Sequence, residues 1–524
     1  MANYNLPGVY TFYRERGLMM APAAAIRATD SILFLGTATD GPKNAIVKVE
    51  RPQDALGIFG SYSTPKGGNA ILPLAFCEAY YAGARNIYLM RVTGKDASLV
   101  LSDAEGEVIR LLGKYPGSKY NDIEAKIETD AGDGEKKLSL PESDVVFVLS
   151  EMKSVQDLAD QVNLFAELSG VRAEVINSSA DVNDLVEVSG SLSGGDDELE
   201  IVGSGASNGQ ILLGSYSQID ELGNETSATG YRAALEGAYE LLAENSANII
   251  VPLGVNLGFT DGSTPSINKT DANKLAEFCY EAAGRNNDLI GMIAVAPFKD
   301  ITLSGIKTEA EKYAAADNTY TAEDEEDIGK YISVVLGEGL FNDRFVGMYS
   351  NVMVAAYAGL VSTLPLKSGS TNKSIEGVAG LRYQLSASQA EALRANKITT
   401  VRDKFGRGAT VVEGIVASLP SSDFQSLSTI RTIHGVMDAV RDTVDPFLGE
   451  SLDIHHVSSL QSAIQGTLES FVADGTLSGA RFELLFPEFS AILGDIDVQL
   501  ELEIASELRR VLVTVSRQIP ELNR

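Results

Sequence analysis

The chain has 524 residues, enough for about three or four domains of ~100–200 residues each. Its content of 44% hydrophobic and 22% charged residues is ordinary for a folded, soluble protein. A formal net charge of −30 at pH 7 argues against nucleic acid or an anionic membrane as a direct partner.

The N-terminal sequence and the cysteines indicate the compartment in which the chain is made. The opening MANYNLPGVY has neither a basic region nor an apolar core, so we expect no secretory signal. The longest apolar runs are far shorter than the ~20 residues that span a bilayer, so we expect no membrane insertion. Cys77 and Cys279 each lie in an apolar helical pattern, which predicts buried free thiols rather than a disulfide. We therefore expect synthesis in the cytosol.

Helices alternate with short apolar strands in two separate parts of the chain. Strands are predicted at residues 31–36, 87–92, 248–254 and 289–297, and helices between them at 69–86, 231–245 and 271–287. Such alternation is typical of an α/β layer with parallel pairing. We assign residues 21–104 and 228–396 to the two parts of one α/β core.

The segment between these two parts, residues 105–227, has a different pattern. Ile123, Ala125 and Ile127 alternate with polar residues, and residues 145–150 form another apolar run, so both stretches predict strands. A tract rich in Gly and Ser follows. Because exposed loops tolerate long insertions, the simplest interpretation is a β-rich domain inserted into a loop of the α/β core.

The last part of the chain, residues 397–524, predicts an α+β domain. Two segments place apolar residues on one helix face, and residues 480–486 predict a strand. The stretch DIDVQLELEI alternates strictly, which predicts a strand with one buried face formed by Ile496, Val498, Leu500, Leu502 and Ile504. A second apolar run follows, with Val511, Val513 and Val515. Both stretches need partners for their backbone groups, although they lie near a chain end.

The residues that could carry chemistry form no convincing site. His434 is expected at the surface or partly packed, and His455 and His456 are expected on opposite faces of an extended segment, which suits metal binding poorly. The stretch SGSTNKS at residues 368–374 lacks the glycine that a phosphate-binding loop requires before its lysine. We therefore expect no catalytic residues, no metal and no cofactor.

Several stretches together resemble the tail sheath proteins of contractile phage tails and related injection machines. The match covers most of the chain in the expected order, and it is weakest over residues 129–227. It is carried by LPGVY at residues 6–10, SILFLGTATDGP at 31–42, PQDALGIFG at 52–60, KGGNAILPLAFCEAYYAGARNIYLMRV at 66–92, GKYPGSKYNDIEAKI at 113–127, KFGRGATVVEGIVAS at 404–418 and DAVRDTVDPFLGE at 438–450.

The resemblance implies a homopolymer of stacked hexameric rings around a tail tube, whose contraction drives the tube through a cell envelope. It implies the tube protein, the baseplate and the tail terminator as partners, and a place in a virion tail assembled in the bacterial cytoplasm. It also implies that residues 1–20 and the C-terminal strands add to sheets of neighbouring subunits. The predicted linking residues are Val9, Tyr10, Phe12, Ile496, Val498, Leu500, Leu502, Ile504, Val511, Val513 and Val515.

Two other functions stay open at this point. The chain could be a different self-assembling scaffold, such as a tube or shell subunit, or, as a more remote alternative, an enzyme built on the α/β layer. Electron microscopy separates the first alternative from a sheath, and a turnover assay tests the second. Because residues 105–227 are interpreted as an insertion, replacement of residues 107–225 by a short linker is expected to leave assembly largely intact.

Overall fold

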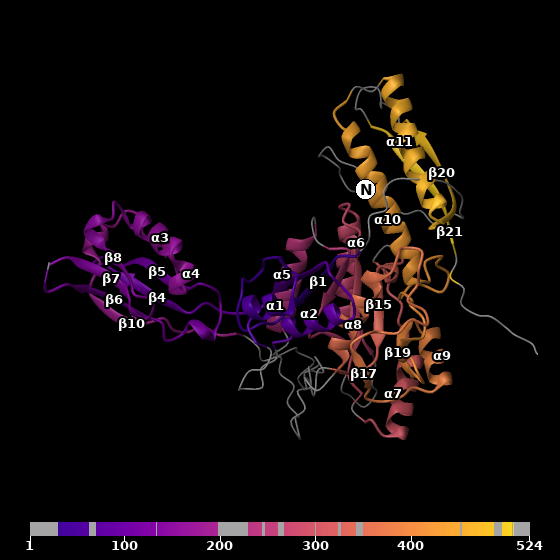
Figure 1. The fold of residues 1–524 in the computed structure, drawn as a ribbon, viewed down its shortest axis with the longest axis horizontal. Helices are drawn as coiled ribbons and strands as arrows, with labels where there is room; N and C mark the ends of the chain where they lie inside the picture. Colours follow the sequence, from indigo (N-terminus) through magenta and orange to yellow (C-terminus); the bar gives the residue numbers. More distant parts are fainter. Residues whose placement is uncertain are drawn as a thin grey trace, which may run out of the picture.

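The computed structural model describes residues 30–61, 70–132, 134–197, 229–243, 247–259, 267–298, 300–322, 326–341, 349–450, 453–486, 495–505 and 507. Three regions are distinct in Figure 1: a central α/β core, a lobe to one side that contains β4–β10, and a unit of helices and strands at one end.

A ten-stranded sheet forms the centre of the core, with the main strand order β19-β18-β15-β14-β11-β1-β3-β2. The central neighbours from β3 to β18 all pair in parallel, as the alternation of helices and strands predicted. Its strands are β1 (Ile32–Gly36), β2 (Val47–Val49), β3 (Ile87–Arg91), β11 (Ile249–Pro252), β12 (Asn256–Phe259), β13 (Ile267–Asn268), β14 (Ile290–Val295), β15 (Ile332–Leu336), β18 (Ile398–Lys404) and β19 (Gly408–Val411).

Helices cover this sheet, because every residue of β1, β14 and β15 is buried and both faces of those strands therefore need cover. Helix α8 packs on β11 and β14, and α6 packs on β14 and β15. A small separate pair is formed by β16 (Gly339–Phe341) and β17 (Val378–Leu381). The helices of the core are α1 (Pro52–Phe59), α2 (Leu72–Tyr81), α5 (Thr229–Leu242), α6 (Thr270–Ala283), α7 (Leu303–Ala315), α8 (Tyr349–Thr363) and α9 (Ala387–Ala395).

The predicted boundary at residue 397 is wrong. The pairing of β18 with β15 places residues 398–411 in the large sheet and not in a C-terminal domain. The physical reason is the burial of β15, whose backbone needs a strand on each side. The terminal unit therefore begins after β19, and its first helix, α10 (Leu427–Val444), is itself shared with the core.

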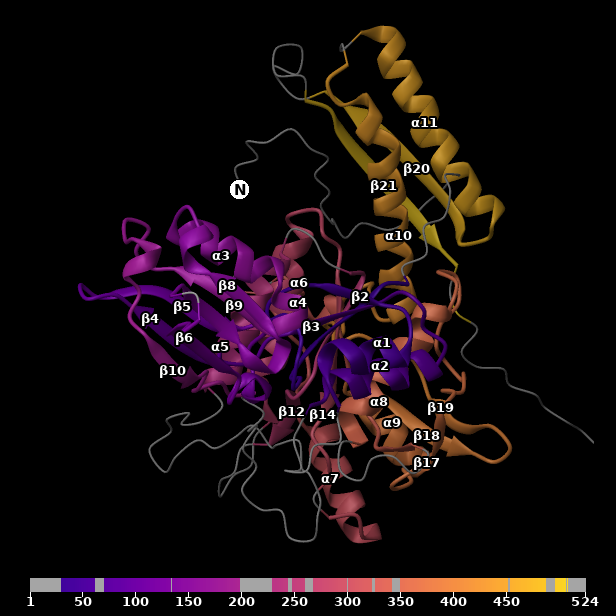
Figure 2. The same ribbon diagram turned by 60° about the vertical axis from the view of Figure 1, so that its left-hand side comes forward.

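The side lobe has a hydrophobic core of its own, built from residues between Ala97 and Leu192. A three-stranded sheet, β4-β5-β9, and a four-stranded sheet, β10-β6-β7-β8, enclose it together with helix α3 (Figure 2). Its elements are β4 (Ser98–Ser102), β5 (Glu107–Gly113), β6 (Glu124–Thr129), β7 (Lys136–Leu140), β8 (Val145–Val148), α3 (Val155–Leu164), α4 (Ala166–Ser169), β9 (Val171–Val175) and β10 (Val188–Ser191).

A buried arginine joins the lobe to the core. The Arg91 side chain at the end of β3 is fully buried, and its Nη1 donates to the carbonyl oxygens of Gly41 at 3.3 Å and Pro116 at 2.6 Å. On the lobe side, Lys95 and Asp196 exchange two backbone hydrogen bonds and bring the entering and leaving chains together. The lobe is therefore fixed to the core at a narrow polar neck.

The backbone pairing at this neck determines where the chain should be cut to test whether the lobe is an inserted domain. Removal of residues 107–225 leaves β4 without β5, and with it Ala97 and Leu101 of the lobe's core, so apolar surface is exposed. Replacing residues 97–194 by an Asn-Gly turn is expected to give a folded core instead, because the Lys95–Asp196 pair already forms the base of a hairpin. Gel filtration and far-UV circular dichroism check this, and an insoluble product would contradict it.

The terminal unit contains α10, α11 (Ile454–Ala473), β20 (Leu477–Leu485) and β21 (Asp497–Ile504). Two further expectations for this part of the chain are wrong. His434 is buried on α10 because it faces the core, and its ring stacks on Tyr331. His455 and His456 lie in the first turn of α11, because Asp453 accepts hydrogen bonds from both backbone amides and so begins the helix.

The described residues give three further facts. Cys77 and Cys279 are buried and not joined in a disulfide, as predicted, and burial raises the pKa of the Cys279 thiol. No helix in the described ranges is long and apolar enough to cross a bilayer. No group of three or more His, Cys, Asp or Glu side chains in those ranges could hold a metal ion.

Candidate assembly surface

Strands β20 and β21 form an antiparallel pair over nearly their whole length. Their register places Ala480 opposite Leu502, Phe482 opposite Leu500 and Leu484 opposite Val498, all on one face. The register shifts between Leu477 and Gly479, where a bulge ends the regular pairing. The period-two pattern of the sequence therefore corresponds to a two-stranded ribbon that places its apolar side chains on one face.

The two faces of this ribbon differ in character. The apolar side chains of both strands pack on the cluster formed by α10 and α11, whose buried members include Leu460, Ile464, Leu468 and Phe471. On the other face an Arg481–Glu501 pair lies directly across the strands, and the remaining outward side chains are mostly acidic. Burial of one face therefore fixes the register of the ribbon.

The edges of this ribbon are its most informative feature. Within the ranges that the structure describes, β20 and β21 pair only with each other. Each strand therefore has an outer edge whose backbone N–H and C=O groups receive no strand partner from those ranges. Such an edge is a template for a further strand, and the adjoining apolar face supplies pockets for alternate side chains.

The structure places only some of the predicted linking residues. Ile496, Val498, Leu500, Leu502 and Ile504 lie on β21 or just before it, and β21 has a partner in its own chain. The predicted linking residues before β1 and after residue 507 lie outside the described residues; they are Val9, Tyr10, Phe12, Val511, Val513 and Val515. Their role as intersubunit strands stays a prediction.

A charged cluster secures α10 to the core, and nothing in the sequence pattern indicates it. Arg441 Nη1 lies 2.6 Å from Asp288 Oδ2 in the core and 2.8 Å from Asp438 Oδ1 on its own helix. Burial, with the nearby Asp288 charge, raises the pKa of Asp438 to about 6, although Arg441 opposes this. Burial lowers the pKa of His434, one turn away, to about 4. Asp438, whose pKa is raised, and His434, whose pKa is lowered, therefore lie together at the junction of the core and the terminal unit.

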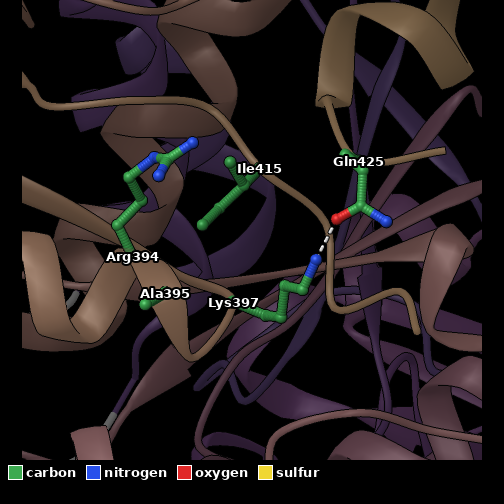
Figure 3. Close-up of a pocket in the computed structure, with 5 residues that line it drawn as sticks. All are labelled: Arg394, Ala395, Lys397, Ile415 and Gln425. Atoms are coloured by element: carbon green, nitrogen blue, oxygen red, sulfur yellow. Dashed lines mark hydrogen bonds between the residues drawn. The ribbon is translucent and has the colours of Figure 1, made fainter. Parts of the chain in front are cut away.

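The structure also contains a small polar cavity of about 200 Å³ beside the end of α9 (Figure 3). It is lined by Arg394, Ala395, Lys397, Ile415 and Gln425. The Lys397 amine donates to Gln425 Oε1, and the Arg394 guanidinium pairs with Glu413. Both cations already have partners within the chain, so this cavity does not indicate a ligand site.

Comparisons with solved structures identify the fold. The sheath tail protein from Listeria innocua aligns with a TM-score of 0.52 and 14% identity, over 92% of this chain and 96% of its own. The sheath tail protein from Desulfitobacterium hafniense aligns with a TM-score of 0.50 and 12% identity, over 95% of this chain and 100% of its own. This chain has the tail sheath fold.

The same fold is found in an extracellular contractile injection system. The sheath of that system in its contracted state aligns with a TM-score of 0.51 and 10% identity, over 99% of both chains. No family model matches the sequence, and no curated protein matches it. Identities this low mean that the sheath fold is recognised through its three-dimensional arrangement.

Proposed function

We propose that this chain is a structural subunit of a contractile sheath. It polymerises as stacked hexameric rings around a tail tube, and contraction of the sleeve drives the tube through a target cell envelope. The observation that carries the proposal is the pair of open strand edges on β20 and β21, in a chain with the tail sheath fold. The role is structural and includes no catalytic step.

The open edges suggest how subunits are joined. Strand β21 is held by β20, so in this proposal the β20–β21 ribbon receives strands, and the segments that donate them are residues 1–20 and the run from Val511 to Val515. A donated strand gains main-chain hydrogen bonds along an edge, and its alternate apolar side chains extend the face that covers α11. Each subunit is then both donor and acceptor, as a continuous lattice requires.

The other parts of the chain take complementary roles in this proposal. The α/β core forms the body of each subunit, and the lobe that contains β4–β10 is an inserted domain on the outer side of the sleeve. The tail tube, the baseplate and the terminator are the expected partners, in a virion tail or related particle assembled in the bacterial cytoplasm. The net charge of −30 is consistent with contacts to protein and not to nucleic acid.

Electron microscopy of the overexpressed full chain tests the proposal. Wide, striated sleeves are the expected product, because rings of subunits stack with a regular axial repeat. Thin, smooth tubes would instead indicate a tube subunit and would overturn the proposal, as would a protein that stays monomeric at every concentration and ionic strength tried.

A further inference from the structure

The chain returns to the body of the subunit immediately after β21 ends. Three residues past Ile504, the Glu507 carboxylate lies at the N-terminus of α10, which is far from it in sequence. Thr371 Oγ1 donates to Glu507 Oε2 at 2.9 Å, and Ser426 Oγ donates to Glu507 Oε1 at 2.9 Å. The Ser428 hydroxyl also donates to Oε1. Three hydroxyls from two separate segments therefore converge on one carboxylate.

The surroundings of Glu507 suit a carboxylate in two further respects. Ser426 precedes the first residue of α10, but its side chain accepts no capping hydrogen bond from that helix, so its hydroxyl is available to Glu507. The helix N-terminus also favours a negative charge, since its N–H dipoles point toward it. These features define a carboxylate cradle made of Thr371, Ser426 and Ser428.

Gly369 lies against the Glu507 carboxylate and borders this cradle. A Cβ atom at Gly369 would lie only 2.0 Å from Glu507 Oε1. The nearest atoms that such a Cβ would meet all belong to the Glu507 carboxyl group, which is the end of a flexible side chain. Only a glycine leaves room for the carboxylate here, and a larger residue would displace Glu507 without disturbing the backbone around it.

We propose that the carboxylate cradle anchors Glu507 and so fixes the point at which the C-terminal extension leaves the subunit. This inference rests on the proposed sheath function for its consequence, which is efficient linking between subunits. Loss of the anchor frees residues 505–507 and adds roughly 10 Å of slack at ~3.3–3.6 Å per residue. Slack lowers the effective concentration of the extension at a neighbouring sheet edge, so assembly becomes less efficient.

Limited trypsin digestion of the folded monomer tests the anchor directly. Glu507→Ala removes the carboxylate, Gly369→Ala fills the cradle, and Glu391→Ala removes an exposed carboxylate of α9, away from the ribbon and the cradle, as a matched control. Cleavage after Arg509 and Arg510 is followed by intact-mass spectrometry, with cleavage at the exposed Arg407 in the β18–β19 turn as internal reference. Both cradle variants are expected to be cut about tenfold faster than wild type, because both lose the hydrogen bonds that hold the charged carboxylate in the cradle.

The double variant makes the test specific. Because both substitutions abolish the same contact, Glu507→Ala with Gly369→Ala is expected to be cut no faster than either single variant. The Glu391→Ala control is expected to match wild type. Unchanged cleavage in both single variants would overturn the anchor, and so would fully additive effects in the double variant.

Sleeve formation separates this inference from the proposed function. If wild type forms sleeves, both cradle variants are expected to form fewer of them at the same concentration, while Glu391→Ala forms as many as wild type. Wild-type yields from both cradle variants would overturn the link between anchor and assembly. If wild type forms no sleeves, the proposed function fails, and the digestion rates still decide whether Glu507 is anchored.

Discussion

Truncation after Arg509 is expected to give a soluble, folded subunit that forms no sleeves. The shortened chain keeps β20, β21 and the apolar cluster that they share with α10 and α11, so the fold of the terminal unit does not depend on the removed residues. It loses the run from Val511 to Val515, which the proposal assigns to a neighbouring sheet edge. Deletion of residues 1–20 is expected to have the same effect.

The size of the effect follows from cooperativity in a lattice. Burying five aliphatic side chains contributes roughly 7–15 kcal/mol at ~1.5–3 kcal/mol each. Ordering ten residues costs about 10–20 kcal/mol at ~1–2 kcal/mol per residue. One donated strand is therefore marginal alone, whereas many strands in one lattice reinforce each other through effective concentration. Loss of one strand per subunit should abolish sleeves and not merely reduce their number.

A single charged substitution tests the same linking-strand mechanism without removing any residues. Val513→Asp places a carboxylate on the apolar side of the predicted strand, where burial without a partner is unfavourable, so sleeves are not expected. Thr514→Asp is the matched control, because its side chain lies on the opposite face of a strand. Electron microscopy and sedimentation report assembly, and circular dichroism reports folding.

Normal striated sleeves from the truncated chain would disprove the linking-strand mechanism, and an unfolded product would show that these residues belong to their own subunit's core.

Opposite pH dependences are expected from substitutions of Asp438 and His434. The pKa of Asp438 is raised from 3.8 to about 6, so its carboxyl group contributes stability below pH 4 that is lost as the pH rises to about 6. The pKa of His434 is lowered from 6.5 to about 4, so its neutral ring contributes stability above pH 6.5 that is lost as the pH falls toward 4. Between pH 4 and 6 the two contributions change in opposite directions and largely cancel.

Either substitution is expected to reveal the contribution of the other group. Asp438→Asn leaves His434, so the free energy of unfolding relative to wild type should fall as the pH decreases from 6 to 4. His434→Gln leaves Asp438, so the same difference should rise. The pKa of each group is shifted by about two units, and one pKa unit corresponds to ~1.4 kcal/mol. Each change in the free energy of unfolding is therefore on the order of 3 kcal/mol. Arg441, Asp442, Asp288 and Lys330 surround the pair and stay unchanged in both variants.

Urea unfolding of the monomer truncated after Arg509 measures this effect at several pH values. Far-UV circular dichroism is the suitable signal, because the chain contains no tryptophan. Asp445→Asn, which alters an exposed carboxylate at the end of α10, is the control and should follow wild type at every pH. If Asp438→Asn and His434→Gln both follow wild type as well, these two groups do not titrate as their burial requires.

The sequence by itself determined the elements whose patterns are local. Continuous apolar runs predicted the buried strands β1, β3, β11 and β14, and alternation predicted β21, because side-chain periodicity follows directly from strand and helix geometry. The order of several weak motifs also indicated the tail sheath family, whose fold the structural comparisons confirm.

The tertiary structure decided everything that depends on contacts between distant residues. The position of β18 beside β15, the burial of Arg91 at the neck and the Asp288–Arg441 pair each join segments that no local pattern relates. Glu507 is the clearest case, since in sequence it is one more acidic residue after an alternating strand. Only the fold brings it to the hydroxyls of Thr371 and Ser426, because a partly buried polar contact requires a geometry that the chain acquires only when it folds.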